Sequence, residues 1–254
     1  MDYFVNHDSI VRQIWGKSDT ILFIFAGAAA EFALNKAVDW LYFTGRLPAD
    51  PLGRLFSTVS YARKIVFSPN DDALRAIDSI SAIHSAVEAK RGGKIPDWAY
   101  RDVLFMLIDY SVRAFELLER RLTDEEKQDV FDVFYRVGNR MQLVGLPENY
   151  REYEVMRKSH LQSDMAHSSF TTDLFTQYRK HLGAIRYRIL LESQILVVPE
   201  QVRKLLQFRN ESLLGPLLAM YKVARTIRLD SLLKALILPN AYKQQIRALD
   251  IHTT

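Results

Sequence analysis

The sequence contains no cysteine. Disulfides, thiolate metal sites and a cysteine nucleophile are therefore excluded, and the absence fits a reducing compartment. The opening residues, MDYFVNHDSIVRQIW, lack the basic region and the apolar run of a secretory signal. From these two features we expect a cytoplasmic protein.

Glycine and proline are also scarce, with 10 and 8 residues in a chain of 254. So few turn formers argue against a turn-rich β architecture and against long irregular loops. Long hydrophobic runs are missing too: the most apolar one, residues 20–34, is interrupted by Glu31. It is too short to cross a bilayer comfortably, and we expect a helix buried in a core and no transmembrane segment.

Several functional motifs are absent as well. The sequence has no glycine-rich phosphate loop and no nucleophile elbow. Residues 178–254 carry 13 lysines and arginines against 5 acidic residues. These charges are spread among leucines and isoleucines at helical spacing, without an aromatic-interleaved basic stripe, so we expect a solvated helix face and no nucleic-acid partner.

Helical periodicity dominates what is present. It predicts an all-α protein, a single domain over residues 1–254 with about ten helices. Two of the expected breaks are the loop at 43–51 and the sequence VGLPEN at 144–149. The expected segments include one long helix from 19 to 40 and a pair at 171–182 and 184–195. Pro199 and Pro239 each follow an apolar run and suit the first turn of a helix.

The helix expected after Asp72 carries an imidazole on its apolar stripe. Ile77, Ile80, His84 and Val87 recur at intervals of three and four, so His84 shares the side that should face the core. A neutral histidine with hydrogen-bond partners for both nitrogens is common in protein cores. Alternatively, one imidazole in an apolar pocket suits an axial ligand of haem iron.

The preceding helix, expected at 51–67, places Arg54 and Thr58 one turn apart. Arg54 can hold a carboxylate in bidentate fashion, and Thr58 can add a hydroxyl. A cation near a helix N-terminus opposes the helix dipole, which suggests a specific role. A simple ion pair with an acidic residue is the alternative.

Together, DPLGRLFSTVSYARKIVF and the later IHSAV resemble the paired motif of the MpaB-type oxygenases, the superfamily that includes the latex-clearing rubber oxygenases. The pattern is Asp-Pro, then Arg and Thr four apart, then a His about one helix later that is followed shortly by Val. The resemblance extends more loosely from about Trp15 to Leu206.

The resemblance implies an all-helical fold with a globin-like core and a b-type haem. It makes His84 the proximal iron ligand and Arg54 and Thr58 essential pocket residues. The implied activity is haem-dependent oxygenation of a small or medium hydrophobic substrate with O₂. The alternative is a non-catalytic helical haem carrier, or a cofactor-free relic of the family.

Three departures from the family pattern bear on this. Residues 20–50 contain no histidine, so we expect no second axial imidazole from that region and an iron face open to O₂. The tyrosine that usually follows the histidine helix is replaced by Trp98, and the usual Asp-Pro by Asp102-Val103.

A second constellation lies at HLQSDMAH, where His160, Asp164 and His167 fall on one helix face. Because three ligands on one straight helix are spread over about 10 Å of rise, a joint metal site is disfavoured. We expect a polar face with a His–Asp hydrogen bond.

Overall fold

Ten helices make up the part of the chain that the computed structural model describes, residues 2–45, 49–216, 218 and 221–222. They are α1 (Ile10–Trp15), α2 (Ser18–Phe32), α3 (Val38–Phe43), α5 (Pro51–Phe67), α6 (Asn70–Arg91), α7 (Asp97–Leu118), α8 (Asp124–Arg140), α9 (Tyr150–Ser163), α10 (Ser169–Val197) and α11 (Glu200–Leu205). Within these residues no strand forms, and the predicted all-α class is confirmed.

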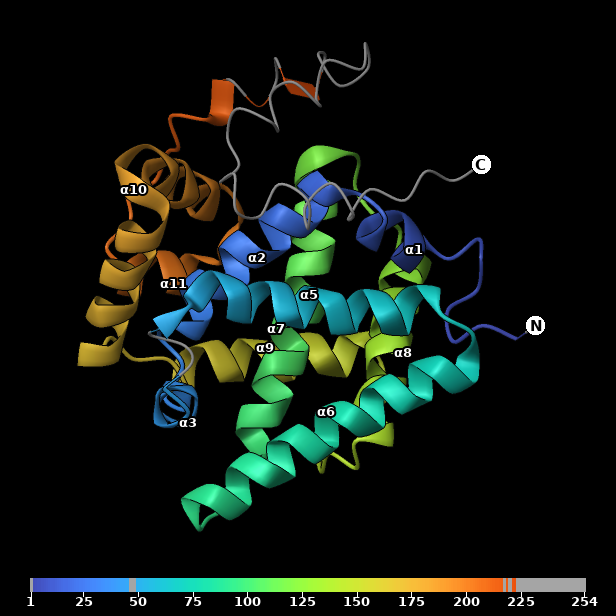
Figure 1. Ribbon diagram of the computed structural model, residues 1–254. Helices are drawn as coiled ribbons and strands as arrows, with labels where there is room; N and C mark the ends of the chain where they lie inside the picture. Colours follow the sequence, from blue (N-terminus) through green and yellow to red (C-terminus); the bar gives the residue numbers. More distant parts are fainter. Residues whose placement is uncertain (1, 46–48, 217, 219–220, 223–254) are drawn as a thin grey trace.

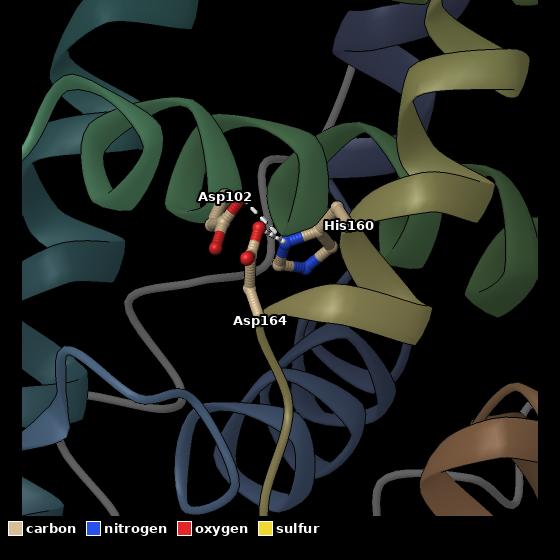
Figure 2. Close-up of side chains that lie close together, drawn as sticks. All are labelled: Asp102, His160 and Asp164. Atoms are coloured by element: carbon tan, nitrogen blue, oxygen red, sulfur yellow. Dashed lines mark ion pairs between the residues drawn. The ribbon is translucent and has the colours of Figure 1, made fainter.

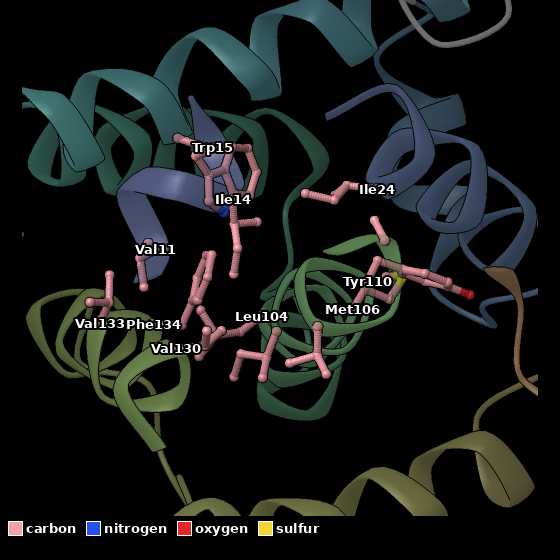
Figure 3. Close-up of a cluster of buried hydrophobic side chains, with 14 of the residues drawn as sticks. Val11, Ile14, Trp15, Ile24, Leu104, Met106, Tyr110, Val130, Val133 and Phe134 are labelled. Atoms are coloured by element: carbon pink, nitrogen blue, oxygen red, sulfur yellow. The ribbon is translucent and has the colours of Figure 1, made fainter. Parts of the chain in front are cut away.

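Helix α7 runs through the middle of the bundle, with α10 at one side and α6 along the lower edge of Figure 1. Helix α7 packs against α2 and α8, and α1 contacts all three of these helices. Buried side chains of these four helices, among them Ile14, Trp15, Met106 and Phe134, meet in one apolar cluster (Figure 3). Burial of this surface is the main driving force that holds the helices together.

Gly27 permits a close approach of α2 to α7. A Cβ atom at this position would lie 2.2 Å from Cε1 of Tyr110. Without it, the Tyr110 ring fits against α2, and its hydroxyl donates a hydrogen bond to Oε2 of Glu31 at 2.8 Å. This contact brings a carboxylate into the core.

The helix expected from 19 to 40 is divided, because α2 ends at Phe32 and α3 begins at Val38. Asn35 stabilises the turn between them by accepting a hydrogen bond from the backbone N–H of Ala37 at 2.8 Å. It also forms an isolated β-bridge with Met165. The turn therefore ties the end of α2 to the segment that follows α9.

The pair expected at 171–182 and 184–195 is present as α10, with a kink where Gly183 adopts φ 72°. The helix start expected at Pro199 is also present, since Pro199 directly precedes α11. Its counterpart at Pro239 lies outside the described residues. The globin-like arrangement of the core and the extension of one domain over residues 1–254 stay predictions.

Candidate functional site

The first turns of α5 present the predicted Arg54–Thr58 pair. Asp50 caps the helix by accepting a hydrogen bond from the backbone N–H of Gly53 at 2.8 Å, and Pro51 occupies the first turn, where its missing N–H costs nothing. Nη1 of Arg54 donates to Oγ1 of Thr58 at 3.0 Å. One turn of helix thus connects a guanidinium to a hydroxyl that helps to orient it.

His84 lies on α6, which packs against α5. Its ring makes an edge-to-face contact with Tyr100, with the ring centroids 5.1 Å apart. Burial lowers the pKa of the His84 imidazole, and the Arg54 cation lowers it further, while Glu88 has the opposite effect. The structure therefore brings Arg54 and His84 together and keeps the imidazole neutral, the form that binds metals.

Nδ1 of His84 is buried and has no hydrogen-bond partner among the described residues. The helix face around it is only partly covered: Ile77 is the last buried residue of α6, and Ile80, His84 and Val87 are half-buried. The stripe expected to be core is therefore core only in its first half. Beyond Ile77, the described chain covers the apolar face of α6 only in part, and the buried Nδ1 of His84 has no hydrogen-bond partner there.

Two neighbours of His84 were not predicted. Oε1 of Glu88 accepts hydrogen bonds from the hydroxyl of Tyr100 at 3.1 Å and from the backbone N–H of Ile95 at 2.8 Å. Glu88 lies four residues after His84, a spacing that was visible in the sequence. Trp98, which stands where the family usually has a tyrosine, has no hydroxyl. Tyr100, two residues later, brings an aromatic hydroxyl close to His84.

A second polar group lies deeper, between α2, α7 and α9. Glu31 is fully buried, and its carboxylate accepts hydrogen bonds from Nη1 of Arg157 at 2.5 Å and from Nη2 at 2.6 Å. Asp109 accepts from Nη2 of Arg157 at 2.8 Å. Burial raises the pKa of the Glu31 carboxyl, but Arg157 and His160 lower it by more, to about 2. Glu31 is therefore a carboxylate inside the core.

His160 connects this group to a cluster of carboxylates (Figure 2). Its Nε2 lies 3.1 Å from Oε1 of Glu31, its Nδ1 is in direct contact with Oδ1 of Asp102, and Oδ2 of Asp164 lies 3.6 Å from Nδ1. Burial lowers the pKa of His160, and the contacts with Asp102 and Glu31 raise it by more. The polar face with a His–Asp hydrogen bond that we expected is not found: His160 and Asp164 approach only to 3.6 Å, in a cluster that includes Asp102 and not His167.

The family model described as "ER-bound oxygenase mpaB/B'/Rubber oxygenase, catalytic domain" matches residues 13–229. The chain belongs to this family. The match confirms the resemblance found from the α5 and α6 motifs, and it contains both the His84 and the His160 groups. Comparison with curated proteins and with solved structures gave no match.

In this MpaB/rubber oxygenase domain, a cavity of about 440 Å³ lies between α10 and the residues that follow α11, and no residue of either group is among those that line it. Phe175, Phe208 and Leu191 line its apolar side, while His167 and Arg179 are among its polar residues. No described helix combines the length and the apolarity needed to cross a bilayer.

Proposed function

We propose that this member of the MpaB/rubber oxygenase family binds haem b through His84 and uses it to oxygenate a hydrophobic organic substrate with O₂. A cytoplasmic location is part of the same proposal. The observation that carries it is the state of His84: a neutral imidazole with a buried Nδ1 that lacks a described partner. Buried histidines that serve only packing usually have both nitrogens hydrogen-bonded.

The residues around His84 fit the group that the family implies. Haem needs one strong axial nitrogen, an apolar surface for the macrocycle and a cation for its carboxylates. His84 supplies the nitrogen, and the half-buried face of Ile80 and Val87 supplies apolar surface. Arg54, held by Thr58, supplies the cation.

When bound, the iron supplies the oxygen chemistry, and the protein contributes ligation, polarity and access. Burial lowers the pKa of His84, the charge of Arg54 lowers it further, and Tyr100 restricts the rotation of the ring through its edge contact. The guanidinium of Arg54 suits either a propionate or the polar edge of the oxygen site. Thr58 orients the guanidinium in both cases.

The structure also bears on a second axial ligand. A desolvated lysine, such as Lys36 or Lys64, is an amine that could bind the iron in place of a second histidine. Nζ of Lys36 donates a hydrogen bond to the carbonyl of Ser163 at 2.5 Å. Lys64, another candidate, has an exposed side chain at the far end of α5 from Arg54. Neither supports a six-coordinate iron, so we expect one face to stay open.

The test is to purify the protein, measure its Soret band and haem content, reduce it anaerobically and add CO. An oxygenase site predicts about one haem per chain and a rapid shift to a CO-bound Soret band. A low-spin ferrous spectrum that ignores CO would replace this proposal with a haem carrier. A colourless protein that takes up no added haemin would identify a cofactor-free member of the family.

A further inference from the structure

A second site is formed by Asp102, His160 and Asp164, on α7 and at the end of α9. Asp102 comes from the first half of α7, His160 from the last turn of α9, and Asp164 directly follows α9. One ligand atom from each residue lies within 4.8 Å of the others. Figure 2 shows the two carboxylates facing the same ring nitrogen.

The hydrogen bonds of Glu31 decide which nitrogen of His160 is available. Glu31 accepts from Arg157 twice and from Tyr110, so it is an ionised acceptor. Nε2 of His160, 3.1 Å from Oε1 of Glu31, therefore carries hydrogen. A carboxylate behind the imidazole is the usual outer partner of a metal-binding histidine, because it fixes the ring and makes the opposite nitrogen more basic.

Nδ1, the opposite nitrogen, is buried and has no aligned hydrogen-bond acceptor, although Oδ1 of Asp102 is in contact with it. His160 as a whole is only 4% exposed. Without an ion, a hydrogen on Nδ1 stabilises the contact with this carboxylate, and a metal ion that binds Nδ1 takes the place of that hydrogen. The carboxylate lies off the direction of the N–H bond, so this contact does not satisfy Nδ1 as a hydrogen bond.

Outer contacts fix the two carboxylates as well. Nδ2 of Asn35 donates to Oδ2 of Asp102 at 3.0 Å, which leaves Oδ1 for the cluster. The backbone N–H of Lys36 donates to the carbonyl of Asp164 at 3.0 Å, and the hydroxyl of Ser163 donates to its Oδ1 at 3.1 Å. All three donors are therefore oriented before any ion binds.

We propose that Asp102, His160 and Asp164 bind a divalent transition metal of the zinc class, which links α7 to the end of α9. One imidazole nitrogen and two carboxylate oxygens are ligands that Zn²⁺ accepts, and three protein ligands leave a fourth position for water. The two carboxylates neutralise the charge of the ion. The side chain of Asp164 is 25% exposed and opens the site to solvent.

Asp164→Asn is the most informative variant, because Asp164 is the ligand outside the buried Glu31–Arg157 group and its loss leaves that group intact. Full-length protein is stripped with chelator and titrated with ZnCl₂ by calorimetry, and bound zinc and iron are counted separately by elemental analysis. Wild type is expected to bind one Zn²⁺ per chain. Asp164→Asn is expected to bind it about 100-fold more weakly.

Asp129→Asn, which changes an exposed carboxylate on α8, is the matched control and should bind zinc like wild type. Zinc should also raise the Tm of wild type and of the control, but not that of Asp164→Asn. The same titration is repeated on His84→Ala, which is expected to carry no haem, so that haem iron does not affect the measured zinc stoichiometry. Absence of a zinc-dependent Tm rise in wild type, or equal zinc affinity in wild type and Asp164→Asn, would overturn the proposal.

Discussion

Arg157 binds Glu31 through two parallel hydrogen bonds of 2.5 and 2.6 Å, although the two side chains are only 6% and 0% exposed. A bidentate pair at this depth joins α9 to α2 with fixed geometry. Both side chains are needed for stability, because either charge alone would be strongly unfavourable in the core.

Glu31→Gln should therefore destabilise the fold by about 3–5 kcal/mol, since it leaves the Arg157 cation buried without its main partner. The free energy of unfolding from urea denaturation measures the loss. Asp78→Asn removes one partner of the exposed Arg140 pair and is the control, with a much smaller effect expected. Equal losses in the two variants would show that burial adds nothing to the Glu31 pair.

Gly27→Ala should cost about 1–3 kcal/mol, because the added Cβ would lie 2.2 Å from the Tyr110 ring and force α2 and α7 apart. Thermal unfolding followed by circular dichroism reports the effect. Gly93→Ala is the matched control: its Cβ would meet nothing closer than Trp40 at 3.7 Å. If Gly27→Ala unfolds at the wild-type temperature, the close packing at Tyr110 is not required.

Glu126 should contribute to the acid sensitivity of the fold. Hydrogen bonds from Arg120 lower the pKa of its carboxyl from an ordinary 4.5 to about 2, with further help from the backbone N–H of Thr123. Because the folded pKa is the lower one, this stabilisation is present above pH 4.5 and disappears as the pH falls towards 2.

Glu126→Gln should accordingly be less stable than wild type at pH 7, and the difference should shrink between pH 4.5 and 2. Urea denaturation at several pH values gives both curves. Glu154→Gln, at an exposed position of α9, should follow wild type throughout. A difference that stays constant with pH would show that the charge of Glu126 is not what stabilises the α8 start.

Arg54 should matter for haem through its shape as well as its charge. Arg54→Ala should lower haem content or turnover more than Arg54→Lys, because lysine keeps the charge and loses the bidentate fork. Pyridine haemochrome spectra quantify the haem, with Arg151→Ala as a control at an exposed arginine. Wild-type haem content and turnover in Arg54→Ala would reduce the arginine to a structural ion pair.

Local patterns in the sequence were enough to predict much of the fold. Apolar spacing and helix-start residues located α5, α6, α8 and α9, because these signals act within a few residues. The contact of Arg54 with Thr58 follows from a spacing of four on one helix. The division between α2 and α3 was missed, since it depends on Asn35 contacting a segment that is remote in the sequence.

The buried polar cluster could not be predicted for the same reason. Glu31 looked like an interruption of an apolar run, yet its partner Arg157 is 126 residues away. Asp102 likewise meets His160 only because α7 and α9 pack together. Periodicity shows which side of a helix is apolar, but not which charges from different helices meet.

The haem content of His84→Ala tests the central claim most directly. Wild type, His84→Ala and His181→Ala are produced under identical haem supply, and haem per chain is measured by pyridine haemochrome alongside helical content by circular dichroism. His181 is an exposed histidine of α10 and serves as the control. The account predicts about one haem per chain in wild type and His181→Ala, and almost none in a fully helical His84→Ala. A stoichiometric Soret-absorbing haem in His84→Ala would contradict it.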